Sequence, residues 1–167
     1  MQKVEYQQIE TAGGLALHLR RMVSEDIPQV LVLERAAHSH PWRPASFEAC
    51  VSGRQICWLA FLDETLAAYL VVTYGGGDAE LLNLVVAQAY QQRGIGAALL
   101  KFAQDFLRPH ADMLFLEVRV SNRKAIDLYA RSGFFEIGHR KNYYPAHNGH
   151  EDALLMASQL RMNGFGG

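Results

Sequence analysis

The segment that most constrains the fold is residues 79–107, where an apolar run meets a glycine-containing turn and then a helical pattern. The run AELLNLVV (79–86) is typical of a central strand, and we expect both of its faces to be covered. The turn QQRGIG leads into a segment whose apolar residues recur at helical spacing, namely Ile95, Leu99, Phe102 and Phe106. A buried strand that turns directly into a helix indicates a fold that layers helices on a sheet.

The two glycines of this turn suggest an anion site. Gly94 and Gly96 let the backbone turn without Cβ clashes, so that successive N–H groups can point in one direction. The positive end of the following helix lies behind those amides, and Arg93 would add a cation. A Rossmann fingerprint is excluded because Leu99 stands where its third glycine belongs, and a P-loop because no Lys-Ser or Lys-Thr pair is present. A tight turn without a ligand is the alternative.

The remaining patterns predict a mixed sheet with helices packed against it. Further strands are expected at 15–22, 55–63, 65–74, 113–120, 134–145 and 151–160. Further helices are expected from Ser24 or Asp26 to Ala37, after Pro44, and over 122–132, the last with Ser121 or Asn122 as N-cap and Gly133 as C′ residue. We therefore expect one α/β (α+β) domain over 1–162, with six to seven strands and about four helices, and a flexible tail at 163–167.

Composition narrows the class of protein. The chain has 167 residues, half of them hydrophobic, and a net charge of −1, which argues against a general binder of nucleic acid or membrane surfaces. Cys50 and Cys57 are too widely spaced for a CxxC pair, so we expect reduced core residues. His38 and His40 lack companion ligands at metal spacing, and we expect no metal. The longest apolar run, 66–72, is too short for a bilayer span and the N-terminus lacks a targeting pattern; we expect a cytoplasmic monomer.

Longer blocks resemble a known family. The pattern Q-x-x-G-x-G after LLNLVV resembles the pyrophosphate motif of the GNAT superfamily of acyl-CoA N-acyltransferases. The blocks RAAHSHPWRPASF, LEVRVSNRKAIDLYARSGF and RKNYYPAHNGHEDALLM resemble the bacterial ribosomal-protein-alanine N-acetyltransferases within it. The resemblance covers about Arg20 to Ala157, although VVAQAYQQ lacks the Asp-Pro that is common in relatives.

This resemblance implies an activity and a fold. It implies the GNAT fold and the transfer of an acetyl group from acetyl-CoA to the N-terminal α-amine of a protein. The implied acceptor is the N-terminal alanine of a small-subunit ribosomal protein. Transfer to a lysine or a small amine, and a non-catalytic acyl-CoA-binding module, are the alternatives.

The resemblance also implies roles for individual residues. Glu117 would act as general base and Tyr129 as general acid in a direct transfer, and Asn122 would contact acetyl-CoA near its sulfur. The pantetheine arm would lie along the backbone of Leu84, Val85 and Val86. The pyrophosphate would be held by the turn, which comprises Gln91, Gln92, Arg93, Gly94, Ile95, Gly96 and Ala97.

The chemistry of acetyl transfer calls for a base. An N-terminal α-amine has a pKa of about 8 and is largely protonated at neutral pH, so a neighbouring group must remove its proton. Glu117 lies in an alternating strand, on the face that also carries Phe115 and Arg119. A solvated carboxylate, or one paired with Arg119, is the alternative interpretation.

The departing thiolate calls for an acid. Tyr129 shares a helical face with Asn122 and Ala125. A phenol with a pKa of about 10 can protonate a thiolate whose acid has a pKa of about 8.5. An ordinary core aromatic is the alternative. For the acceptor peptide we expect contacts with Trp42, Tyr143 and Tyr144, although Trp42 could equally be a core residue, and Glu34, Glu151 and Asp152 are candidates to face a basic substrate.

Overall fold

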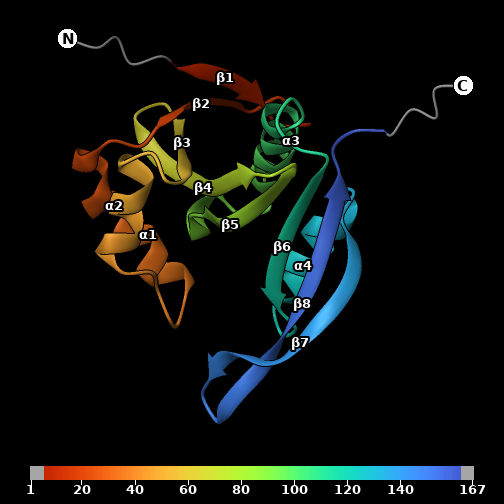
Figure 1. Ribbon diagram of the computed structural model, residues 1–167. Helices are drawn as coiled ribbons and strands as arrows, with labels where there is room; N and C mark the ends of the chain where they lie inside the picture. Colours follow the sequence, from red (N-terminus) through yellow and green to blue (C-terminus); the bar gives the residue numbers. More distant parts are fainter. Residues whose placement is uncertain (1–5, 163–167) are drawn as a thin grey trace, which may run out of the picture. The chain divides into compact units, whose positions relative to one another are not determined.

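The computed structural model describes residues 6–162, which form two compact units interleaved along the chain (Figure 1). The first unit contains residues 6–73 and 82–102, and the second contains residues 74–81 and 103–162. The predicted tail at 163–167 lies outside the described residues. The single domain over 1–162 stays a prediction.

The first unit contains most of the strands that run before the glycine turn. Its strands are hydrogen-bonded in the order β1-β2-β3-β4-β5, and the three pairs from β1 to β4 are antiparallel. The strands are β1 (Gln7–Glu10), β2 (Ala16–Arg21), β3 (Ile56–Leu62), β4 (Thr65–Gly75) and β5 (Asp78–Val86), of which β4 and β5 run on into the second unit. The helices are α1 (Ile27–Ala37), α2 (Pro44–Val51) and the first part of α3 (Ile95–Leu107).

The second unit is built around a long hairpin. Strands β7 (Phe135–Ala146) and β8 (Gly149–Gln159) pair antiparallel, and β8 also pairs antiparallel with β6 (Met113–Arg119), as Figure 1 shows in blue and green. Strand β6 pairs parallel with β5 over Asp78–Glu80 and Met113–Phe115. Helix α4 (Arg123–Arg131) follows β6. The mixed sheet and the four helices of the described chain confirm the predicted fold class, with eight strands in place of six or seven.

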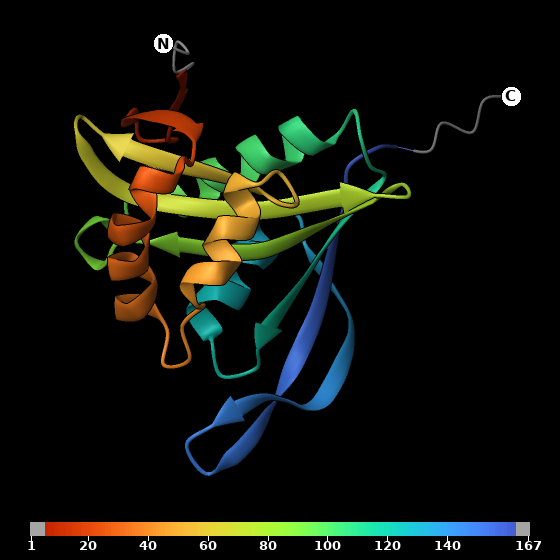
Figure 2. The same cartoon turned by 60° about the vertical axis from the view of Figure 1, so that its left-hand side comes forward.

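The core of the first unit explains why its strands are so apolar. Helices α1 and α2 lie side by side (Figure 2), and their buried Val30 and Phe47 pack with Leu59 of β3. The next residue of β3, Trp58, points to the opposite face, where its ring lies 5.0 Å from that of Phe102 in α3. Strand β3 is therefore covered on both faces, which a continuous run of apolar residues favours.

Two expectations about strands differ from the structure. Strand β1 was not predicted, because its four residues, QQIE, are mostly polar and exposed and carry no alternation of hydrophobic residues. The prediction that β5 is covered on both faces is wrong. Its exposure alternates, with Leu81 and Val85 buried and Leu84 and Val86 half-buried, so an apolar run can also border a partly covered face.

A buried carboxylate connects α1 to the strands of the first unit. The Glu34 side chain is 0% exposed and accepts hydrogen bonds from the Tyr69 hydroxyl in β4 and from Asn83 Nδ2 in β5 at 2.9 Å. The backbone N–H of Trp42 donates to Glu34 Oε1 at 3.1 Å. Burial, followed by the adjacent carboxylate, raises the pKa of Tyr69 well above its ordinary value. A carboxylate so enclosed cannot face a basic substrate, and that expectation for Glu34 is wrong.

The Tyr69 hydroxyl is one of the hydrogen-bond donors that stabilise the buried carboxylate of Glu34. Replacing Tyr69 by phenylalanine leaves the buried carboxylate one donor short, and we expect the free energy of unfolding to fall by about 1–3 kcal/mol. Urea unfolding followed by circular dichroism measures the change. The control is Tyr74→Phe, which alters an exposed hydroxyl on the same strand. Equal stabilities for the two variants would show that the Tyr69–Glu34 bond contributes nothing.

Candidate functional site

The turn between β5 and α3 presents unpaired amide donors. The main chain enters the left-handed region twice, at Gln92 with φ 63° and at Gly94 with φ 81°. The first helical hydrogen bond runs from Ala98 N to Gly94 O at 3.1 Å. The amides of the three residues before Ala98 lie in the first turn of α3 and have no acceptor within the helix. They also carry the positive end of the helix dipole, so this turn can hold an anion.

Two contacts fix this turn against the first unit. A Cβ built on Gly94 would lie 3.4 Å from the Cβ of the buried Thr11, so the backbone packs there at van der Waals contact. Gln91 Nε2 donates to Val86 O at 3.1 Å and ties the turn back to the end of β5. The structure thus brings the predicted residues 84–86 and 91–97 together in one unit. The guanidinium of Arg93 lies 5.6 Å from the centroid of the Tyr90 ring.

In the second unit, Glu117 lies on the half-buried face of β6. The exposure of β6 alternates as predicted, with Leu116 and Val118 buried and Glu117 half-buried. Glu117 Oε1 lies 3.3 Å from Arg140 Nε in β7. The predicted alternative partner, Arg119, instead pairs with Glu151 Oε1 at 3.0 Å.

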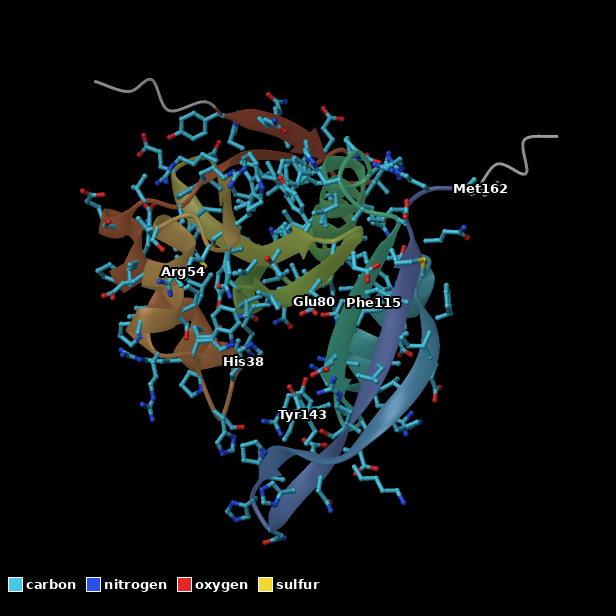
Figure 3. All side chains as sticks on the ribbon, viewed as in Figure 1. His38, Arg54, Glu80, Phe115, Tyr143 and Met162 are labelled. Atoms are coloured by element: carbon cyan, nitrogen blue, oxygen red, sulfur yellow. The ribbon has the colours of Figure 1, made fainter. Side chains whose placement is uncertain are left out.

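A bulge in β7 lies beside Tyr143, which interacts with Glu117. Between the register pairs Arg140↔Ala153 and Tyr144↔Glu151, β7 advances four residues while β8 advances two. Asn142 absorbs the irregularity with φ 53°, and its N–H donates to Asp152 Oδ1 at 3.0 Å. Bulges re-aim side chains in this way. Beside the bulge, the hydroxyl of Tyr143 interacts with Glu117, and this interaction raises the pKa of Tyr143 (Figure 3 labels Tyr143).

The phenol of Tyr129 is enclosed in the second unit. Tyr129 is 9% exposed and lies in α4, with its ring centroid 5.7 Å from that of Phe134. Burial, followed by the charge of Tyr144, raises the pKa of Tyr129 to about 12. The hydroxyl therefore carries its proton at neutral pH. At the start of α4, Asn122 Oδ1 accepts a hydrogen bond from Ala125 N at 3.3 Å, which confirms the predicted cap.

Tyr144 links the groups that surround Glu117. Its ring lies 4.9 Å from that of Tyr143, and the guanidinium of Arg119 lies 4.6 Å from its centroid. Burial, followed by the charge of Glu117, raises the pKa of Tyr144 to about 12. Glu117, Tyr143 and Tyr144 thus form one cluster of acid and aromatic groups within the second unit, and Tyr144 also acts electrostatically on Tyr129.

Trp42 belongs to the first unit, where its surroundings favour the core alternative. The ring packs against the core and lies 5.4 Å from that of Phe47. His38, labelled in Figure 3, ends α1, and its Nε2 lies 3.4 Å from Asn83 Oδ1. A contact between Trp42 and an acceptor peptide stays a prediction.

Sequence reasoning missed two features of these sites. It assigned no partner to Glu117 on β7, although Arg140 lies in a basic run just before the tyrosine pair. It also missed the buried network of Glu34, for which a polar residue inside an apolar strand, Asn83, was the available signal.

Figure 3 also labels Glu80 and Phe115, which are register partners where β5 meets β6.

Residues 6–162 contain neither a candidate metal site nor a candidate membrane-spanning helix. No group of three or more histidine, cysteine, aspartate or glutamate side chains in this range is arranged to hold a metal ion. Over the same residues, no helix has the length and apolar character needed to cross a bilayer.

Comparison with known proteins places this chain among the acetyltransferases. The sequence model of the acetyltransferase (GNAT) family matches residues 23–134. The [ribosomal protein bS18]-alanine N-acetyltransferase of Salmonella typhimurium is 37% identical over 138 residues, which are 82% of this chain and 93% of the relative. The protein of that name from Escherichia coli K12 is 36% identical over the same shares of the two chains.

Solved structures agree with the sequence comparison. The crystal structure of the ribosomal-protein-S18-alanine N-acetyltransferase from Escherichia coli has a TM-score of 0.82 and 34% identity, and the match covers 90% of this chain and 97% of that chain. The structure of Arabidopsis thaliana NAA60 in complex with acetyl-CoA has a TM-score of 0.77 and covers 86% of this chain and 98% of that chain. Its 21% identity makes this a likeness of fold alone.

Proposed function

Because the chain belongs to the GNAT family of acetyltransferases, we propose that it transfers an acetyl group from acetyl-CoA to the N-terminal alanine of a small-subunit ribosomal protein. One observation carries the mechanism. The second unit holds a reachable carboxylate, Glu117, and an enclosed phenol, Tyr129, which are the two groups that an amine and a thiolate require. The names of the relatives support the choice of acceptor.

The first unit fits acetyl-CoA. Amides in the first turn of α3 and the guanidinium of Arg93 suit a pyrophosphate, and Gly94 places no side chain in the turn. The backbone of Leu84–Val86 lies beyond the short segment of β5 that pairs with β6, and we assign it to the amides of the pantetheine arm. Bound acetyl-CoA supplies an activated thioester.

Proton transfer falls to side chains of the second unit. Glu117 takes one proton from the α-ammonium of the acceptor, and the nitrogen attacks the thioester carbonyl. As the C–N bond forms and the C–S bond breaks, Tyr129, which is protonated at neutral pH, gives its proton to the leaving sulfur and takes the second proton of the nitrogen in return. The side chain of Asn122 caps α4 through its oxygen and keeps its amide group for a contact near that sulfur. Tyr143 and Tyr144 contact the acceptor peptide.

The acceptor assignment predicts which amine is modified. With acetyl-CoA, a peptide that begins with alanine and has a free N-terminus is expected to gain one acetyl group, measured by intact mass. The same peptide with a blocked N-terminus and an internal lysine is expected to gain none. Acetylation of the blocked peptide would replace the proposed acceptor by lysine, and the absence of transfer to any amine despite acetyl-CoA binding would indicate a binding module.

The two proposed catalytic residues have separate expected effects on rate. Glu117→Gln removes the base and Tyr129→Phe removes the acid, so each is expected to lower kcat by about 10²–10⁴-fold while the KM for acetyl-CoA changes little. Matched controls are Glu136→Gln, an exposed carboxylate of β7, and Tyr74→Phe. Steady-state kinetics with the alanine peptide measures the change. If a variant has the same kcat as its control, the residue replaced in that variant is not catalytic.

A further inference from the structure

We propose that Arg140 is the resident counterion of Glu117 and that the α-ammonium of the acceptor displaces it on binding. The inference rests on the proposed function, because it needs a cationic acceptor at Glu117. It assigns to Arg140 the role of a positioning residue that holds the carboxylate in place until the acceptor binds. A residue of this kind sets how tightly a charged N-terminus binds.

The pair has the geometry of a contact that can open. Arg140 Nε lies 3.3 Å from Glu117 Oε1, and the two side chains are 54% and 29% exposed. The Arg140 guanidinium also lies 5.2 Å from the centroid of the Tyr143 ring. Ion pairs this exposed contribute little to stability, since water and salt screen the two charges. An incoming ammonium can therefore take the place of the guanidinium at small cost.

The second arginine of the cluster is held much more firmly. Arg119 is 25% exposed on its side chain and donates to Pro145 O at 2.6 Å and to Glu151 Oε1 at 3.0 Å. Its guanidinium also stacks over Tyr144. These contacts fix Arg119 in place and neutralise its charge with Glu151. Arg140 has fewer contacts and is the cation that can leave.

The charges around Glu117 favour replacement of Arg140 by the acceptor ammonium over binding of both cations at the same carboxylate. Strand β7 contributes Arg140, the Tyr143 hydroxyl and Tyr144, while β6 contributes Arg119, whose charge Glu151 of β8 already balances. Strand β5 contributes Glu80, which acts electrostatically on Tyr143. Among the residues that the structure describes, Glu117 thus has one cation, Arg140, as its own partner. A second cation at the same carboxylate would meet the like charge of Arg140, so the acceptor and Arg140 compete for Glu117.

The experiment compares Arg140→Gln with Lys141→Gln, which removes the neighbouring charge of β7. Two peptides of one sequence beginning with alanine serve as probes, one with a free α-ammonium and one with an acetylated N-terminus. For Arg140→Gln we expect the Kd by calorimetry and the KM of the free peptide to fall about two- to fivefold, because the competitor is gone. The kcat and the Kd of the acetylated peptide are expected to stay within twofold, and Arg140→Lys restores the wild-type KM.

Several results overturn this inference. A rise or no change in the Kd of the free peptide for Arg140→Gln would mean that Arg140 does not compete with the acceptor. An equal fall for Lys141→Gln would assign the effect to the general field of β7. A failure of the proposed function can be distinguished from a failure of this inference. The NMR signal of the Arg140 Nε–H, recorded on the protein without peptide, tests the ion pair with Glu117 and does not depend on the acceptor. A signal that Glu117→Gln leaves unmoved excludes the pair, whichever amine the enzyme acetylates.

Discussion

The first amide N–H groups of a helix have no acceptor within the helix, and α3 begins with such donors. They follow a turn in which Gly94 has a positive φ, a conformation that a residue with a side chain adopts only with strain. Gly94 adopts φ 81° and packs against Thr11, while Gln91 ties the turn to the last residue of β5. The strand backbone and the helix terminus are consequently held in one arrangement. This arrangement suits a ligand that has a diphosphate at one end and a chain of amides at the other, which is the chemistry of acetyl-CoA.

The second unit gives a carboxylate and a phenol opposite environments. Glu117 is half-buried and pairs with the exposed side chain of Arg140, whereas Tyr129 is 9% exposed and has a pKa raised to about 12 by burial. A base must be reached by the acceptor and must release its previous partner, while an acid must hold its proton until a thiolate forms. Different burial of two titratable groups is a general way of separating these roles in one site.

Local patterns predicted the elements that carry the site, and long-range pairing supplied the rest. The alternation around Glu117 predicted β6, and Asn122 and Gly133 predicted the ends of α4. The contact between Glu117 and Arg140 could not be predicted in this way, because it joins β6 to β7 across the intervening strand β8, which no local pattern reveals. Strand β1 was missed for a similar reason, since its pairing with β2 rather than its own composition makes it a strand.

Calorimetric titration of coenzyme A into two glycine variants tests the central claim, that the turn before α3 binds the diphosphate. Gly94→Ala and Gly53→Ala both place a side chain at positive φ, 81° and 87°, but a Cβ on Gly53 meets nothing within 4 Å. The account predicts that the Kd rises about tenfold or more for Gly94→Ala, because strain of a few kcal/mol distorts the amide cradle, and stays at the wild-type value for Gly53→Ala. Equal affinities in both variants and the wild type would contradict it.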